Sequence, residues 1–66
     1  MKLKLGDKVQ IKQSSEFYIR EDNANPIGAV GEIYEIKEEM ALPIYVKWEN
    51  AFSNSYEEID LELIKN

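Results

Sequence analysis

The stretch from Pro43 to Asn50, PIYVKWEN, constrains the fold of this chain more than any other part of the sequence. Ile44, Val46 and Trp48 alternate with polar or amphipathic residues, and this period of two predicts a half-buried strand. Proline is tolerated at the first residue of a strand, and asparagine is common in the turn that follows one. We therefore expect the central strand of a small β-barrel here, with other short strands folded around it.

The N-terminal segment shows the same period of two. Apolar residues occupy odd positions, whereas lysines and a glutamine occupy even ones. Gly6-Asp7 interrupts the pattern as a turn or bend, so the regular strand is expected from Lys8 to Lys12. The pattern predicts a row of lysines on the outer face and places these residues toward the core: Leu3, Leu5, Val9 and Ile11.

Residues 32–37, EIYEIK, predict the next strand. Ile33 and Ile36 are three apart, which breaks strict alternation, and a β-bulge or sharp bend would let both face the core. A one-turn helix is the competing interpretation. The preceding glycines, Gly28 and Gly31, suit a turn with positive φ or the close approach of two backbones. Residues 38–42 would connect this strand to the central strand as a hairpin.

The C-terminal part predicts a short strand, a single turn of helix and a closing strand. Residues 55–57 can pair back against the central strand after a polar turn. Residues 58–61, EIDL, are too few for a stable α-helix and predict a 3₁₀ turn. Residues 62–64 can pair with the first strand, and Lys65-Asn66 should fray.

The longest irregular stretch lies between the first two strands, at residues 13–27. Residues 21–26, EDNANP, are turn-forming, and long loops in small domains often carry function. Residues 16–20 could extend as one arm of this loop. Phe17, Tyr18 and Ile19 cannot all point inward from an extended arm, so at least one aromatic ring should be partly exposed.

The residue types argue against an enzyme. The 66 residues, expected to form a single domain, include no cysteine and no histidine. This removes the thiol nucleophile, the commonest general base at neutral pH and most transition-metal sites. The paired carboxylates are sequence neighbours, and neighbours on a strand point to opposite faces. They also lack calcium-loop spacing. We expect no catalytic residue, no metal site and no cofactor.

The net charge of −5 is unevenly distributed. Residues 1–12 carry four lysines and one aspartate, a charge of +3, so residues 13–66 carry −8. An acidic protein repels phosphate backbones unless its lysines converge on one patch, and it is better suited to a basic protein partner. Neither a membrane span nor a signal peptide is predicted, so the expected location is the cytoplasm. The lysines that could form a basic face are Lys2, Lys4, Lys8 and Lys12, with Lys47 as a further candidate.

Several motifs resemble those of SH3-like domains. Residues 6–11, GDKVQI, are similar to a G-D-x-V-x-V opening, and residues 28–33, GAVGEI, to a G-x-x-G-x-V strand entry. Residues 44–50, 54–56 and 60–64 resemble the pattern V-x-V-x-W-D-N-G, N-S-Y and D-L-E-L-I. This pattern is associated with small SH3-like proteins of phages and prophages. After Trp48, Glu49 and Ala51 stand where the pattern has aspartate and glycine.

More distantly, residues 42–46, LPIYV, are similar to a strand of two other SH3-like proteins. These are the SH3-like subunit of photosystem I and the variable chain of ferredoxin–thioredoxin reductase, which serve as docking or scaffolding parts. The resemblances imply a five-stranded SH3-like barrel, all-β, with a long first loop and a one-turn 3₁₀ helix before the last strand. They also imply a phage-derived protein acting in a host cytoplasm.

We therefore expect a protein-interaction module, as a monomer or weak dimer, with an unidentified protein partner. Peptide-binding SH3 domains use aromatic residues of the first loop, of the strand after the second loop and of the 3₁₀ turn. Tyr34 and Tyr45 would point outward. Trp48 shares a face with apolar residues, so the core is favoured over a binding surface for it. The alternatives are a nucleic-acid-binding domain that uses the lysines and a small structural subunit of a larger complex. The candidate partner-binding residues are Phe17, Tyr18, Tyr45, Trp48 and Tyr56.

Overall fold

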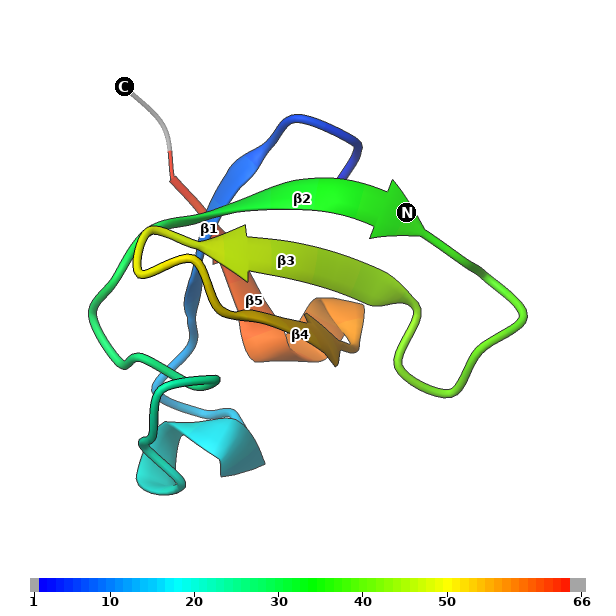
Figure 1. The fold of residues 1–66 in the computed structure, drawn as a ribbon. Coiled ribbons are helices and arrows are strands. Elements are labelled where there is room, and N and C mark those ends of the chain that lie inside the picture. The colour runs from blue at the N-terminus through cyan, green and yellow to red at the C-terminus, as the bar shows by residue number, and fades with distance from the viewer. Residues whose placement is uncertain (1, 65–66) are drawn as a thin grey trace.

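The computed structural model describes residues 2–64 as five strands and two short 3₁₀ turns (Figure 1). The strands lie in the order β4-β3-β2-β1-β5, and every neighbouring pair is antiparallel. This confirms the predicted all-β, SH3-like arrangement, with a long loop after β1 and a 3₁₀ turn before the last strand. The elements are β1 Lys8–Ile11, η1 Glu16–Ile19, β2 Gly31–Ile36, β3 Ile44–Trp48, β4 Ser53–Tyr56, η2 Glu58–Asp60 and β5 Leu61–Leu63.

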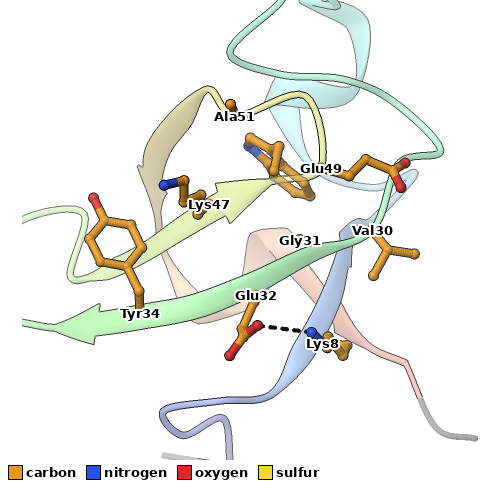
Figure 2. Close-up of a pocket in the computed structure, with 9 residues that line it drawn as sticks. Lys8, Val30, Gly31, Glu32, Tyr34, Lys47, Glu49 and Ala51 are labelled. Carbon is orange, nitrogen blue, oxygen red and sulfur yellow. Dashed lines mark hydrogen bonds and ion pairs between the residues drawn. The ribbon is translucent and has the colours of Figure 1, made fainter.

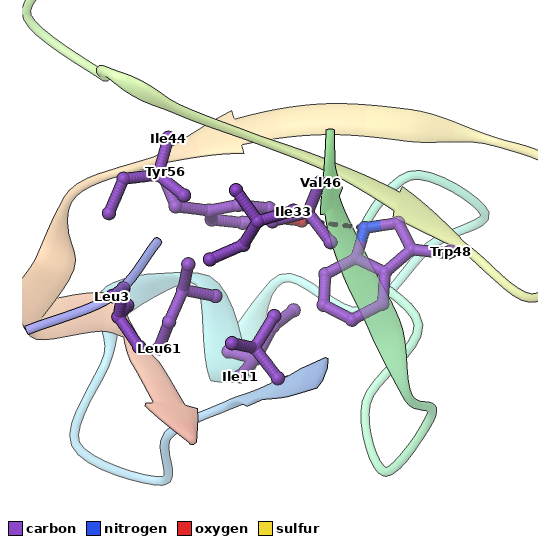
Figure 3. Close-up of a cluster of buried hydrophobic side chains, with 9 residues drawn as sticks. Leu3, Ile11, Ile33, Ile44, Val46, Trp48, Tyr56 and Leu61 are labelled. Atoms are coloured by element: carbon purple, nitrogen blue, oxygen red, sulfur yellow. Dashed lines mark hydrogen bonds between the residues drawn. The ribbon is translucent and has the colours of Figure 1, made fainter. Parts of the chain in front are cut away.

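Strand β3 contributes three inward side chains to the core, as its alternation predicts. Ile44, Val46 and Trp48 are buried, while Lys47 is exposed. One part of the prediction is wrong, because β2 and not β3 is the middle strand of the sheet. The reason is that β5 pairs with the free side of β1 and so lengthens the sheet on the far side of β2. The buried apolar cluster lies between these strands (Figure 3): Leu3, Val9, Ile11, Ile33, Ile44, Val46, Trp48, Tyr56 and Leu61.

The turn before β1 explains why one residue of the N-terminal pattern does not face the core. Gly6 has a φ of 89°, and Asp7 accepts a hydrogen bond from the Lys4 N–H (3.0 Å). The predicted bend is therefore confirmed. Leu5 lies in this turn and is exposed, so its predicted core position is wrong. Alternation holds only within a strand, and β1 begins three residues later.

A β-bulge in β2 lets two apolar residues reach the core, as the spacing predicts. Ile33 pairs with Val46, the register then shifts, and Glu35 pairs with Tyr45. Tyr34 is the extra residue, so two residues of β2 oppose one of β3. This confirms the bulge and excludes the one-turn helix. As a consequence, Ile33 is buried and Ile36, beyond the bulge, packs against the same core.

The first loop contains η1, so the prediction of an extended arm at residues 16–20 is wrong. The Ser15 hydroxyl caps the turn by accepting the Phe17 N–H (3.0 Å), and it donates to Asp60 Oδ1 (2.8 Å). A tertiary contact therefore decides the local conformation. As expected, the two aromatic residues of this segment, Phe17 and Tyr18, are only half-buried.

The C-terminal elements follow the sequence prediction closely. η2 is a single 3₁₀ turn in which Asp60 Oδ2 accepts the Glu57 N–H (3.0 Å), forming a capping box. β5 then pairs with β1, with Leu63 opposite Val9 and Leu61 opposite Ile11. The predicted fraying of Lys65-Asn66 lies outside the described residues.

Candidate protein-binding surfaces

An open hollow of about 620 Å³ lies where β1, β2 and β3 run side by side (Figure 2). We call it the tyrosine groove. Two lysines, two glutamates and a half-exposed tyrosine line its surface, and the indole of a buried tryptophan lies beneath it. Its lining residues are Lys8, Val30, Gly31, Glu32, Tyr34, Lys47, Trp48, Glu49 and Ala51.

Antiparallel pairing places the charged residues of the tyrosine groove in one row. Glu32 of β2 lies opposite Lys8 of β1 on one side and opposite Lys47 of β3 on the other. Lys8 Nζ and Glu32 Oε1 form an ion pair at 2.8 Å, drawn as a dashed line in Figure 2. Opposite charges on directly opposed residues stabilise such a pair. This row is therefore electrically mixed and not a basic stripe.

Gly31 brings β2 close to the indole of Trp48. A Cβ atom at this position would lie 2.5 Å from Trp48 Cε3 and 2.5 Å from Val46 Cγ1. The predicted close approach therefore exists, but it is between a backbone and two side chains and not between two backbones. The predicted positive φ is at the other glycine, Gly28, at 84°.

Tyr34, which lines the tyrosine groove, forms an edge-to-face pair with Tyr45, which lies beside the groove. Their ring centroids are 6.2 Å apart and the ring planes make an angle of 68°. Lys37 Nζ lies 5.4 Å from the Tyr45 ring centroid, within the range of a cation–π interaction. Tyr34 is 49% exposed, because the bulge leaves it without a partner residue on β3. The outward orientation predicted for both tyrosines is confirmed.

Two of the predicted partner-binding residues belong to the core. Trp48 is 2% exposed and Tyr56 is 0% exposed, so neither ring forms part of an exposed binding surface. The pleat of β3 turns Trp48 inward with Ile44 and Val46, and Tyr56 stacks edge-to-face on Trp48 at 5.7 Å. Phe17 in turn stacks edge-to-face on Tyr56 at 5.2 Å. The three rings therefore pack on one another and do not form an open aromatic platform.

A buried polar network joins two of these aromatic residues to the first loop. The Trp48 Nε1–H donates to the Tyr56 hydroxyl (3.1 Å), which donates to Asn25 Oδ1 (2.7 Å). Asn54 Nδ2 also donates to Asn25 Oδ1 (3.0 Å). Burial raises the pKa of the Tyr56 hydroxyl to about 12. The network fixes the first loop against β3 and β4, so these aromatic residues hold the scaffold together.

The predicted lysine face is divided among several hollows. Lys8 lines the tyrosine groove, Lys4 lines a hollow with Leu5, and Lys2 and Lys12 line a third hollow. The turn at residues 5–6 leaves Lys2 and Lys4 outside β1, and Lys2 shares its hollow with Lys12 from the far side of that turn. Lys8 is also neutralised by its ion pair. The four lysines of the possible basic face therefore line three hollows and do not converge on one.

Two smaller hollows meet at η2. The acidic groove lies between η1 and η2, and the lysine groove lies between the N-terminal segment, η2 and β5. Ile59 of η2, which is 71% exposed, lines both. The acidic groove comprises Ser14, Ser15, Glu16, Phe17, Leu42, Glu57, Ile59 and Asp60. The lysine groove comprises Lys2, Leu3, Lys12, Glu58, Ile59, Leu61 and Leu63.

Two further observations concern residues 2–64. No group of three or more histidine, cysteine, aspartate or glutamate side chains in this range is arranged to hold a metal ion. No helix in this range has the length and apolar character that crossing a membrane requires.

No protein-family model and no curated protein matches this sequence. Among solved structures, the chain is similar to the NMR structure of Bacillus subtilis protein YorP. The TM-score is 0.71 at 17% sequence identity, and the match covers 100% of this chain and 74% of that one. At this level of identity the likeness concerns the fold, which agrees with the SH3-like arrangement described above. A shared fold does not by itself carry a shared function.

Proposed function

We propose that this chain is a non-enzymatic protein-interaction module that binds a protein partner through the tyrosine groove and the adjoining Tyr34–Tyr45 pair. The observation that carries the proposal is that this aromatic pair is exposed and fixed in position. Tyr34 is half exposed, and its ring is held edge-to-face against Tyr45. Aromatic residues concentrate in the centres of protein interfaces because they bury a large area and lose little conformational freedom.

The charges around the pair favour a protein over a nucleic acid. The tyrosine groove has two lysines, Lys8 and Lys47, and two glutamates, Glu32 and Glu49. Their formal charges cancel, and Lys8 is already paired with Glu32. Nucleic-acid binding depends on unneutralised cations that displace counterions from phosphates. A mixed rim around aromatic residues instead matches the polar rim of a protein interface.

The resemblance of the motifs to small phage and prophage proteins supports a more specific form of the proposal. In that form the chain is a phage-encoded accessory protein that binds or inhibits a host protein in the host cytoplasm. The fixed scaffold suits this role, since the buried Trp48–Tyr56–Asn25 network holds the loop and sheet in one arrangement before binding.

Two exposure-matched substitutions test the proposal. Tyr34→Ala removes an exposed ring of the groove, and Phe52→Ala removes an exposed ring that lies outside it; the two residues are 49% and 48% exposed. The immobilised wild-type chain and both variants are incubated with a lysate of the source organism, and the retained proteins are identified. We expect a protein that the wild type and Phe52→Ala retain and that Tyr34→Ala retains at least tenfold less.

The same comparison can contradict the proposal. Equal retention by Tyr34→Ala and Phe52→Ala would exclude the tyrosine groove as the binding site. A short DNA duplex, added at low salt to the labelled chain, tests the nucleic-acid alternative separately. Amide shifts confined to residues 2–12 and Lys47 would favour that alternative over a protein partner.

A further inference from the structure

The acidic groove and the lysine groove carry opposite charges on the two sides of one short turn. Glu57 and Asp60 line the first, whereas Glu58 and Leu61 line the second, so successive residues around η2 are divided between the two hollows. Ile59 belongs to both and is 71% exposed. An exposed isoleucine on this boundary, with Leu63 also exposed nearby, leaves an apolar strip without an intramolecular partner.

The acidic side has a carboxylate excess that nothing in its lining offsets. Glu16, Glu57 and Asp60 line it, and none of its described lining residues is basic. Asp60 is buried and accepts from Ser15 Oγ (2.8 Å), whereas Glu16 and Glu57 are exposed. Two carboxylates on this side are therefore accessible to a cation from outside the chain.

The opposite side has an excess of positive charge. Lys2 and Lys12 line the lysine groove together with one carboxylate, Glu58, which already accepts the Lys2 N–H (2.8 Å). The backbone fixes the relative positions of the two sides, because the Lys12 N–H donates to the Asp60 carbonyl (2.8 Å) and the Ser15 N–H donates to the Lys12 carbonyl (3.0 Å). The chain thus passes from the lysine side to the acidic side within four residues, from Lys12 to Glu16.

A surface with an acidic half and a basic half is complementary to a second copy of itself. In a two-fold dimer the rotation axis lies in the interface, and both copies use the same surface. Every contact between two different residues therefore occurs twice, once with each copy supplying each residue. An axis along the boundary places each acidic groove against the partner's lysine groove. The residue on the boundary, Ile59, then meets its own copy and is buried by it.

We propose that the surface formed by the acidic groove, Ile59 and the lysine groove is the interface of a symmetric homodimer. The occupant is a second copy of this chain. Lys12 of each copy faces Glu16 of the other copy, and Ile59 lies on the rotation axis. This surface is separate from the tyrosine groove, since the two share no lining residue. The dimer and the proposed protein partner are therefore independent of each other.

Charge reversal on each side, alone and in a mixture, tests the arrangement. Lys12→Glu places glutamate against Glu16 at both contacts, and Glu16→Lys places lysine against Lys12, so each variant alone should associate at least tenfold more weakly. A mixture of the two variants restores opposite charges at both contacts and should associate about as strongly as the wild type. Sedimentation equilibrium from micromolar to millimolar concentration measures each case.

A second pair of variants controls for overall charge. Arg20→Glu and Glu39→Lys carry the same net charges as the first pair, −5 − 2 = −7 and −5 + 2 = −3, but lie outside the proposed interface and outside the tyrosine groove. Each should dimerise as the wild type does, and mixing them should add nothing. A wild-type chain that is monomeric at millimolar concentration would overturn the proposal. So would a mixture of Lys12→Glu and Glu16→Lys that associates no better than its components.

A cross-link tests the position of the two-fold axis. The chain has no cysteine, so Ile59→Cys introduces the only thiol. Residues on a two-fold axis lie within disulfide reach of their own copies, which requires Cα atoms less than about 7 Å apart. Ile59→Cys should form a covalent dimer rapidly on mild oxidation. Ile19→Cys, at a residue 85% exposed and outside both grooves, should form it at least tenfold more slowly; equal rates would refute an axis at Ile59.

Discussion

Replacing Ala51 by glycine should stabilise the protein, although the substitution removes a methyl group and adds no contact. Ala51 has a φ of 72°, in the left-handed region, and is the one non-glycine residue in residues 2–64 with a positive φ. It closes the β3–β4 turn, where its N–H donates to the Trp48 carbonyl (2.9 Å) and the Trp48 N–H donates to the Phe52 carbonyl (2.8 Å). A left-handed residue after a tight turn is a position that favours glycine.

Two opposing terms set the size of the effect. A left-handed conformation costs an L-residue roughly 1–2 kcal/mol, because its Cβ approaches the following carbonyl oxygen. Glycine removes this cost but makes the unfolded chain more flexible, which costs about 0.4–1 kcal/mol. The net expectation for Ala51→Gly is an increase of about 0.5–1 kcal/mol in the free energy of unfolding. For a domain of this size that corresponds to a rise in Tm of about 2–8 °C.

Urea denaturation monitored by tryptophan fluorescence measures the change, because Trp48 is the only tryptophan and is buried. The matched control is Ala41→Gly, at an exposed alanine in the β2–β3 connection that lacks a positive φ. In this variant glycine relieves no strain and only makes the unfolded chain more flexible, so it should lower the free energy of unfolding by about 0.4–1 kcal/mol. If both variants are destabilised to the same extent, the left-handed strain assigned to Ala51 is refuted.

The remaining predictions concern the core beneath the tyrosine groove. Gly31→Ala should destabilise the fold by about 1–3 kcal/mol in the same urea assay, since its Cβ would overlap the Trp48 indole; an unchanged midpoint would contradict the close approach. Tyr56→Phe should cost about 1–3 kcal/mol, because it leaves the buried Trp48 Nε1–H without an acceptor. Burial raises the pKa of Tyr56 from 10.0 to about 12, so the neutral hydroxyl is favoured in the folded state, and stability should fall as pH rises from about 10 to about 12. Alkaline unfolding of Tyr56→Phe should lack this contribution, and identical pH profiles for the two proteins would disprove the assignment.

Local patterns predicted most of the fold because they depend on neighbours along the chain. The alternation of Ile44, Val46 and Trp48 specifies which face of β3 is buried, since the side-chain period of a strand is two. The spacing of Ile33 and Ile36 predicted a bulge or a sharp bend, with a one-turn helix as the competing interpretation, because strict alternation would turn the two residues to opposite faces.

The candidate sites were less predictable, since each is formed by segments that are distant in sequence and come together only in the folded chain. The sequence placed Trp48 and Tyr56 near the stretches that bind peptide in other SH3 domains, but their rings pack on each other and bond to Asn25 of the first loop. It also offered four lysines as a possible basic face, but they line three separate hollows. No local pattern signals the acidic and lysine grooves, whose residues come from segments far apart in the sequence.

By itself the sequence determined the five strands, the break in alternation within β2, the 3₁₀ turn at η2 and the outward orientation of Tyr34 and Tyr45. These features follow from backbone periodicity and from the burial of apolar side chains, which a linear pattern records directly. Only the tertiary structure decided that residues 16–19 form a turn and that Trp48 and Tyr56 are enclosed. It also brought opposite charges together on the two sides of η2. Each of these results depends on a contact between residues distant in sequence, such as Ser15 with Asp60. A short stretch of sequence does not contain both partners of such a contact, so it does not show the stabilisation that the contact provides.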